Sequence, residues 1–525
     1  MNRPNIVWIT ALILSCFFDF LFWKHNPGIS FAIYMILCLV SGFILLGIEG
    51  LKPNWKALLL LLPIAFFSAM SFLRQEPMSL LLSYAFTLFL LGVLAITFLG
   101  GRWLAYSLSD YVANFFILAG NMIARPLAFI IENRRQQAET GSQGGARRVW
   151  TILRGVLIAI PILAIFTALL ASADLIFAQR LDNLIALFRL EKLPEYIFRG
   201  VYILIGAYLL VGVFLYAAAR SRDEKLIGEG KPLVPAFLGF TESAIVLGSV
   251  VLLFAVFVVI QFQYFFGGQA NIHIDGYTYA EYARRGFGEL VAVAFFSLLL
   301  YLGLSAIVKR ETPGQRWGFS GLGIGMVALV GIILVSAFQR LLLYEAAYGF
   351  SRLRTYTHVF VIWLGLLLAV VVVLEIMRRE RIFAAAALLA AIGFAVTLSL
   401  LNVDAFIVRQ NVARAVQGKE LDVAYLASLS TDATPAMAAA YQSPSLPAGT
   451  RYSVGASLAC IQAGAPSRQD TSWQSFQFSR LLDERTLQAV EKDLEGYQIV
   501  DDDWPVKVIT PQGQEYECWG NGMGD

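Results

Sequence analysis

Long uninterrupted apolar stretches constrain the fold of this chain more than any other feature. The runs from Val156 to Leu170 and from Ala244 to Ile260 contain no charged residue. A bilayer-spanning helix needs roughly 20 mostly apolar residues, because lipid offers the backbone no hydrogen-bond partner. Strands of a membrane barrel would instead alternate apolar and polar residues over about ten positions. The pattern therefore predicts an all-α polytopic membrane bundle.

The composition agrees with this fold class. Hydrophobic residues make up 58% of the 525 residues and charged residues 15%, whereas about a quarter of the residues of a soluble protein are charged. Apolar runs between charged or Pro/Gly-rich breaks predict about eleven spans. These are residues 6–23, 29–48, 56–73, 78–99, 150–172, 196–218, 242–264, 287–308, 319–338, 357–377 and 382–401.

The same breaks divide the chain into four predicted sections. They are a front membrane section (1–100), an interfacial segment with a flexible cytoplasmic linker (101–149), a rear membrane section (150–401) and a soluble C-terminal domain (402–525). The part 103–131 is apolar but interrupted. An interfacial helix, a re-entrant helix and one more span all fit it, and an extra span would invert the topology on one side.

The C-terminal section is predicted to be a small α+β domain. Residues 404–419 and 471–497 have helical patterning, and 506–510 and 514–519 are predicted to be two short strands around a turn. Cys460 and Cys518 either form a disulfide in an oxidising compartment or remain two buried thiols.

Lys and Arg alternate unevenly between successive loops. With the N-terminus inside, the cytoplasmic loops hold 19 of these cations and the opposite loops 11. This bias predicts a cytoplasmic N-terminus and an extracytoplasmic C-terminal domain. The net charge of +3 is too small to indicate nucleic-acid binding.

Two segments at the predicted outer lip of the membrane combine Tyr, Arg and Glu. The candidate residues are Tyr277, Tyr279, Glu281, Tyr282, Arg284, Arg285 and Glu289 in the first segment and Arg340, Tyr344, Glu345, Tyr348, Arg352, Arg354 and His358 in the second. Either the segments line an outward-facing cavity that binds a carboxylate or phosphate, or they form a structural ion-pair network. Asp19, inside the first span, is likewise an interfacial carboxylate or a functional one.

Catalytic signatures are missing from the sequence. It has three histidines, no HExxH motif, no paired CxxC, no P-loop, no GxSxG motif and no dinucleotide fingerprint. We therefore predict no catalytic residue, no metal and no cofactor, and we favour a protein that is not an enzyme.

Several segments resemble a known family. They are LFWKHNPGIS, ADLIFAQRL, YTYAEYARRGFGELVAVA, LLLYEAAYGFSRLRTYTHVFVIWLG and LNVDAFIVRQNVARA running into LDVAYLASLSTDATPAM. Together they resemble bacterial multi-span membrane proteins of the domain of unknown function numbered 4153 or 4173. The resemblance implies a multi-pass protein of the bacterial inner membrane and gives no activity.

Three functions follow from these features. The leading hypothesis is a non-enzymatic envelope scaffold or sensor, whose partners are the lipid bilayer and either an unknown protein or a small anionic ligand. The second is a transporter or lipid-handling permease that binds an anionic substrate. The third is an envelope enzyme acting on a lipid-linked substrate, with Glu281 or Glu345 as a base.

Overall fold

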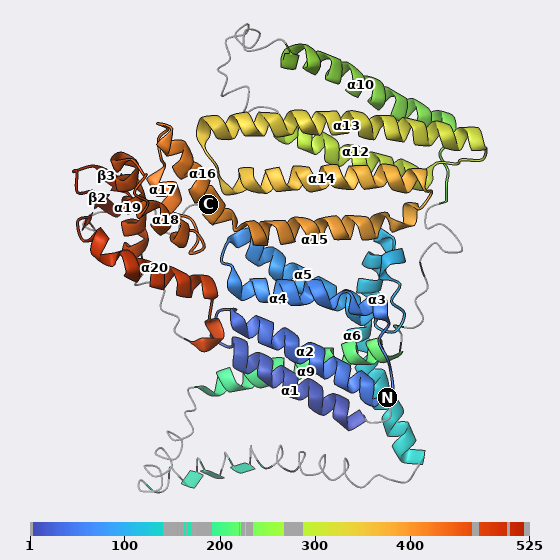
Figure 1. The fold of residues 1–525 in the computed structure, drawn as a ribbon. Helices are drawn as coiled ribbons and strands as arrows, with labels where there is room; N and C mark the ends of the chain where they lie inside the picture. The colour runs from blue at the N-terminus through green and yellow to red at the C-terminus, as the bar shows by residue number, and fades with distance from the viewer. Residues whose placement is uncertain are drawn as a thin grey trace. The chain divides into compact units, whose positions relative to one another are not determined.

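The computed structural model describes residues 4–139, 192–219, 235–266, 287–464, 472–500 and 505–518, with a few isolated positions between 155 and 226. The chain forms two compact units (Figure 1). Unit 1 comprises Met1–Lys24, Ile36–Lys52 and Asn114–Arg222, and unit 2 comprises His25–Met35, Pro53–Ala113 and Asp223–Asp525.

Eleven helices among the described residues are long and apolar enough to cross a bilayer. Ten of them confirm predicted spans, whereas the predicted span 150–172 lies mostly outside the described residues and is not tested. The helices are α1 Pro4–Phe22, α2 Ile29–Ile48, α3 Trp55–Leu58 with α4 Leu61–Leu73, α5 Pro77–Thr97, α6 Leu108–Glu139, α9 Leu193–Ala219, α10 Phe240–Phe266, α12 Phe287–Ile307, α13 Pro313–Tyr348, α14 Arg352–Ile376 and α15 Phe383–Leu401. The short 3-10 turns η1 Trp103–Ala105 and η4 Glu380–Ile382 precede α6 and α15.

Helix α6 covers the segment for which three alternatives were open. Its length and composition suffice for a span. Within unit 1, however, it runs across α9 (Figure 1), and the two backbones approach closely, since a Cβ on Gly212 would lie 2.5 Å from the Met122 Cα. A helix that crosses its neighbour favours the interfacial alternative, which stays a prediction.

Unit 1 is held together by apolar packing of α1 against α9. Val7, Ala11 and Leu14 of α1 are buried against Val211 and Phe214 of α9. These positions recur every three or four residues, so they form one stripe along each helix. The two helices therefore form a stable pair inside the membrane region.

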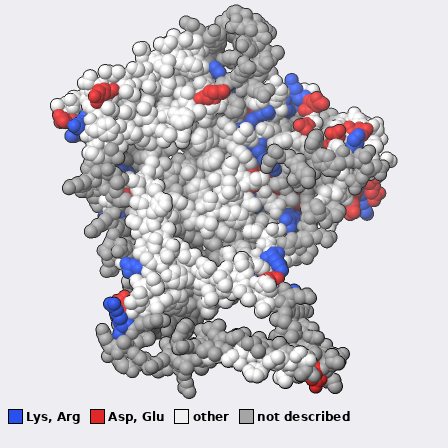
Figure 2. All heavy atoms as spheres, turned by 180° about the vertical axis from the view of Figure 1, so that it is seen from behind, with Lys and Arg blue, Asp and Glu red and all other residues white. Residues whose placement is uncertain are grey.

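Unit 2 contains the remaining membrane helices and the C-terminal domain. Buried residues of α10, α12, α13 and α14 form a common core, with Leu247, Ala294, Phe319 and Leu364 at its centre. On the face of this unit seen in Figure 2, Lys, Arg, Asp and Glu gather on the C-terminal domain and at helix ends. The helical surface between them shows none of these four charged residue types among the described residues on this face, and charged side chains are unfavourable in contact with lipid.

The C-terminal domain is α+β, as predicted. Its elements are α16 Val403–Val416, α17 Val423–Ala427, α18 Thr434–Tyr441, α19 Ala448–Ala463, η6 Trp473–Ser475, α20 Phe478–Leu494, β1 Gln498–Val500, β2 Lys507–Ile509 and β3 Glu515–Glu517. The strands form an antiparallel sheet in the order β1-β2-β3, and Val508 pairs with both Ile499 and Tyr516. Helices α16 and α20 and the β2-β3 hairpin match the predicted elements.

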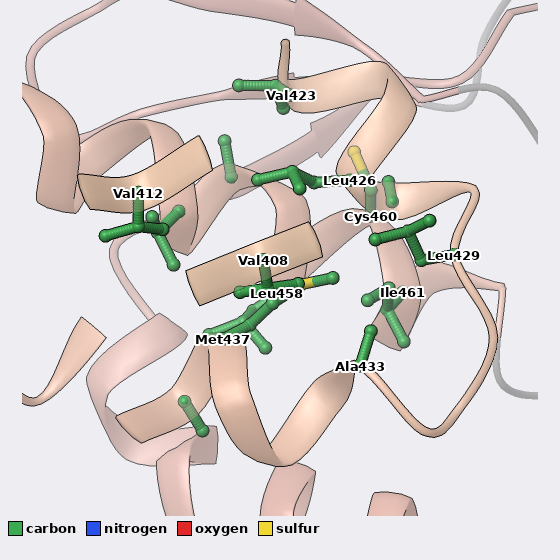
Figure 3. Packing of buried hydrophobic residues seen from close by; sticks show 14 of the residues in the cluster. Val408, Val412, Val423, Leu426, Leu429, Ala433, Met437, Leu458, Cys460 and Ile461 are labelled. Atoms are coloured by element: carbon green, nitrogen blue, oxygen red, sulfur yellow. The ribbon is translucent and has the colours of Figure 1, made fainter. Parts of the chain in front are cut away.

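The domain core extends into the membrane helices. Val408, Leu426, Met437 and Leu458 are fully buried at its centre (Figure 3). Val359 of α14 and Leu398 of α15 belong to the same buried cluster as these domain residues. The domain therefore shares one core with the ends of two membrane helices.

A disulfide fixes the sheet to the helices of this domain. Cys460 of α19 is bonded to Cys518, which follows β3, and their Cα atoms are 5.4 Å apart. In the chain-entropy model, closing a loop of 58 residues stabilises the folded domain by roughly 4 kcal/mol.

Candidate functional site

The second Tyr/Arg/Glu segment forms a helical hairpin. Helix α13 continues to Tyr348, residues 349–351 make the turn, and α14 starts at Arg352. Gly349 has a φ of +83°, which favours glycine. A Cβ there would also lie 2.6 Å from the Arg414 guanidinium and 2.7 Å from the Asn411 amide oxygen. The turn therefore lies directly against α16 of the C-terminal domain.

Arg352 forms a bidentate ion pair with Asp404 at the start of α16. Its Nε donates to Oδ1 at 2.8 Å and its Nη2 to Oδ2 at 2.6 Å. The Asp404 carboxylate is fully buried and also accepts from the backbone N–H of Ser430 at 2.8 Å. The carboxylate therefore has strong partners from both sides inside the protein, and this pair joins α14 to the domain.

Two further polar contacts hold the same turn. The Asn411 side chain accepts from the Phe350 N–H at 2.8 Å and donates to the Phe350 carbonyl at 2.9 Å. The Tyr425 hydroxyl accepts from the backbone N–H of Arg352 at 2.9 Å. Burial raises the pKa of Tyr425 above its ordinary value, so its hydroxyl remains protonated at neutral pH. The domain thus satisfies backbone groups that the turn between α13 and α14 leaves open.

The turn between α4 and α5 is held in a similar way. Asp432 Oδ2 accepts from the N–H groups of Gln75 and Glu76 at 2.7 and 2.9 Å. Glu76 caps α5 in turn, because its carboxylate accepts from the N–H groups of Met78 and Ser79 at 2.9 and 2.7 Å. An acidic residue at a helix N-terminus also interacts favourably with the helix dipole.

The two turns are linked to each other through Glu76. The Tyr356 hydroxyl of α14 donates a hydrogen bond to the Glu76 carboxylate. Arg74, at the end of α4, donates from Nε to the Ser399 carbonyl of α15 at 3.0 Å, and its Nη1 lies 3.9 Å from Asp432. Helices α4, α5, α14 and α15 therefore meet the domain in one polar layer.

The turn before α2 is held by the segment that leads into α20. The Ile29 N–H donates to the Phe476 carbonyl at 3.0 Å, and the Gln477 side chain donates to the Pro27 carbonyl at 3.2 Å. Gly28 packs so closely that a Cβ there would lie 2.5 Å from the Phe476 oxygen. Only glycine allows this approach of two backbones.

The domain therefore holds three inter-helix turns from one side. We call this arrangement the loop clasp, which consists of Phe476 on the turn 25–28, Asp432 on the turn 74–76, and Asp404 with Asn411 on the turn 349–351. Because all three turns contact the domain, they lie on the same side of the membrane as the domain. The count of cations in alternate loops likewise places these three turns and the domain on one common side, and which side that is stays a prediction.

The opposite helix ends of unit 2 also meet. Trp103 Nε1 donates to the Lys56 carbonyl at 2.8 Å, and Arg310 Nη1 lies 3.9 Å from Glu375. Lys56 and Arg310, both of which are predicted to face the cytoplasm, lie at these ends.

The other predicted residues of the hairpin make local contacts. His358 Nδ1 lies 3.1 Å from the buried Glu345 carboxylate. The Arg354 guanidinium covers the Tyr344 ring at 4.1 Å from its centroid, and Tyr344 packs edge-on against Tyr348. Arg340 of α13 also interacts with a neighbouring group. These contacts have the character of a structural network.

The first Tyr/Arg/Glu segment lies outside the described residues except for its last member. Glu289 is exposed in the first turn of α12. The residues of this segment that lie beyond the described part of the chain are Tyr277, Tyr279, Glu281, Tyr282, Arg284 and Arg285. The hypothesis that the two segments face one cavity therefore stays a prediction.

A small pocket opens beside the hairpin. It has a volume of about 190 Å³, and Arg354 and Arg414 line it together with Glu420 and Asp422. Burial lowers the pKa of Arg414, and the Arg354 guanidinium lowers it further. Arg414 donates to the carbonyls of α13 residues at 3.0 and 3.2 Å. In the described part of the chain neither arginine forms an ion pair with a carboxylate.

Unit 1 has its own buried carboxylate. Asp19 of α1 accepts from Arg199 Nε at 2.9 Å and from the Tyr202 hydroxyl, both on α9. Nearby, Glu195 accepts from Trp23 Nε1 at 2.8 Å and lies 2.9 Å from the Lys24 ammonium. Asp19 thus serves to pair two helices.

Sequence analysis missed the acidic side chains that complete the clasp. Asp404, Asp432 and Glu76 were not among the candidates, although LNVDAF and STDAT were noted as family-like segments. A carboxylate directly after the last span, or directly before a helix, is the signal that would have indicated them. In the described ranges no three His, Cys, Asp or Glu side chains gather as metal ligands.

Comparisons with known proteins give a family and no activity. No curated protein and no solved structure matches the chain. Residues 61–440 match the family described as domain of unknown function DUF4153, and this range covers most of the chain, including the loop clasp turns 74–76 and 349–351. The chain therefore belongs to the DUF4153 family, and its apolar helices make it an integral membrane protein.

Proposed function

We propose that the protein is a non-enzymatic membrane scaffold or sensor, in which the loop clasp couples the membrane helices of unit 2 to the C-terminal domain. The bidentate Arg352–Asp404 pair carries this proposal. It joins a membrane helix to the domain through a fully buried carboxylate. Removing one partner from such a pair leaves an uncompensated buried charge, so the helix end and the domain keep one arrangement relative to each other.

The hydrogen bonds of the clasp carboxylates support a role in joining the helices to the domain rather than a role in catalysis. Asp404, Glu76 and Asp432 each accept two or more hydrogen bonds within the protein. A general base needs a lone pair directed at a substrate proton. These carboxylates direct their lone pairs at turn N–H groups and at neighbouring side chains.

We also propose that the clasp lies on the extracytoplasmic side of a bacterial inner membrane. The cation bias between alternate loops supports this orientation, and so does the Cys460–Cys518 disulfide, because disulfides persist in oxidising compartments. Alkaline phosphatase fused after residue 525 should be active and a green fluorescent protein fusion dark. The reverse result would overturn the orientation.

Hydrogen exchange of the full-length protein in nanodiscs tests the coupling. In Asp404→Asn, exchange should rise in α16 and also in the turn 349–351 and the start of α14. Glu420→Gln is the matched control, because this exposed carboxylate has no hydrogen-bond or ion-pair partner among the described side chains. Faster exchange confined to α16, with the membrane hairpin unchanged, would contradict the proposal.

A second candidate is a binding protein or permease for a small anion. The two arginines of the 190 Å³ pocket support it, whereas Glu420 and Asp422 in the same lining balance their charge. Sulfate and acetate titrations of the wild type, Arg354→Ala and Arg414→Ala test this function. Saturable binding that both variants lose, and that Arg485→Ala keeps, would favour it over the scaffold.

A further inference from the structure

A cavity in unit 2 lies between the end of α4 and the C-terminal domain. Its volume is about 660 Å³, which falls within the range of about 300–1,000 Å³ for small-molecule sites. Leu73 and Arg74 of α4 form one wall, and residues of α16, α18 and α20 form the others. None of the predicted candidate residues lines it.

The polar part of the cavity carries a surplus of positive charge. Arg409 of α16 is exposed to the cavity and makes no ion pair or hydrogen bond with the described residues. Arg74 lies 3.9 Å from the Asp432 carboxylate. This carboxylate also accepts hydrogen bonds from two backbone N–H groups, so it balances the charge of at most one arginine. One cation is thus left over, and an arginine is well suited to a phosphate or carboxylate group.

The rest of the lining is apolar. Helix α18 contributes small side chains, including Ala436, Ala439 and Ala440, which leave the space open. Val412 of α16 and Leu482 of α20 face the same space. A ligand that fills it therefore needs an anionic end and a hydrocarbon part, because desolvating a purely polar molecule against these walls is unfavourable.

The cavity borders the membrane surface. Leu73 is the last residue of a membrane helix, so the wall that it forms lies at the level of the headgroups. On the domain side, Trp473, Phe476, Phe478 and Leu482 are exposed large apolar side chains. Aromatic side chains favour the interface between lipid and water. A lipid can therefore enter from the bilayer without passing through water.

We infer that this cavity binds an anionic lipid drawn from the surrounding bilayer, with its acidic group between Arg409 and Arg74 and an acyl chain over the alanines of α18. This lipid site is additional to the proposed scaffold role, because neither Arg352 nor Asp404 lines the cavity. Loss of lipid binding would leave the coupling through that pair intact.

Lipid retention by the full-length protein tests the inference. The protein is placed in nanodiscs of phosphatidylcholine with or without phosphatidylglycerol, and bound lipid is counted by native mass spectrometry after extraction. The wild type should retain phosphatidylglycerol. Arg409→Gln should weaken its apparent affinity about tenfold, which is typical of losing a charge-assisted contact, and Ala439→Trp should block it by filling the space.

Arg485→Gln is the matched control, because it removes an exposed arginine of α20 outside the cavity lining. It should retain phosphatidylglycerol as the wild type does. Melting temperatures of all variants without anionic lipid should agree, which separates lost binding from lost folding. Equal retention by Arg409→Gln and the wild type would overturn the inference, and so would equal retention of phosphatidylcholine. Inorganic phosphate that displaced the lipid or stabilised the protein equally would identify a soluble anion as the ligand instead.

Discussion

Each of the two units contains an Asp–Arg ion pair that joins two elements of the fold, and the surroundings of the two pairs differ. In unit 1, Asp19 pairs with Arg199 between two membrane helices, and the Asp19 side chain remains 10% exposed. In unit 2, Asp404 pairs with Arg352 between a membrane helix and the C-terminal domain, and the Asp404 side chain is 0% exposed. The first pair stabilises one helix against another, whereas the second also defines where a whole domain sits on its helices.

The difference lies in what surrounds each carboxylate. Asp404 receives a backbone N–H from the domain in addition to the guanidinium, and its neighbours Val403 and Ile407 belong to the shared core. Asp19 receives only side-chain donors from α9 among the contacts described for it. Removing Asp404 should therefore disturb more structure than removing Asp19.

The largest expected effect is that of Asp404→Ala, which leaves Arg352 partly buried and without its partner. The free energy of unfolding of the C-terminal domain should fall by about 3–5 kcal/mol, as measured by pulse proteolysis in detergent. Replacing both partners, Asp404→Leu with Arg352→Leu, should recover part of the loss. A single variant as stable as Glu420→Ala would show that the pair contributes nothing.

Gly28→Val tests the first turn of the clasp. The added side chain would meet the Phe476 backbone, so the turn or the start of α20 must shift, at a cost of about 1–3 kcal/mol. The matched control is Gly47→Ala, where a Cβ meets nothing within 4 Å. Faster proteolysis between α19 and α20 in the first variant alone is the expected result.

Asp19→Asn tests the pair in unit 1. The amide oxygen keeps one acceptor for Arg199 or Tyr202, and the site is not closed to water because the Asp19 side chain is 10% exposed, so the expected loss is about 1–2 kcal/mol. Thermal unfolding should show it, whereas hydrogen exchange in the C-terminal domain should stay unchanged. An effect on the domain as large as that of Asp404→Ala would remove the distinction between the two pairs.

The smallest expected effect concerns pH. Burial raises the pKa of Asp432 above 3.8, and hydrogen bonds from Gln75, Glu76 and Ser479 offset this only in part. The unfolded chain therefore loses this proton first as pH rises, so stability falls through the window between 3.8 and the folded-state pKa and stays lower above it. Asp432→Asn should remove this pH-dependent loss of stability. The free energy of unfolding of the wild type and of the variant, each measured from pH 3 to 8, should therefore differ in its pH dependence. Parallel curves would contradict it.

The hydrophobic pattern was enough to predict the membrane helices and the α+β character of the last section, because burial in lipid depends on local composition. The concentration of Tyr, Arg and Glu at the predicted lip of the membrane drew attention to Arg352 and Arg354. Neither pattern predicts which distant side chains form pairs, since Asp404 lies 52 residues from Arg352 and Asp432 lies 356 residues from Glu76. Such pairs depend on the tertiary fold, and one sequence alone contains no measure of which distant side chains meet.

Within unit 2, the turns 74–76 and 349–351 are both hydrogen-bonded to the C-terminal domain, so the helices that they join are held at that end. If the helices of unit 2 rock against one another, the clasped turns are the pivot, and the opposite ends move apart only by breaking their own contacts at Trp103 and Arg310. A small tilt of the domain would then become a larger displacement at those opposite ends.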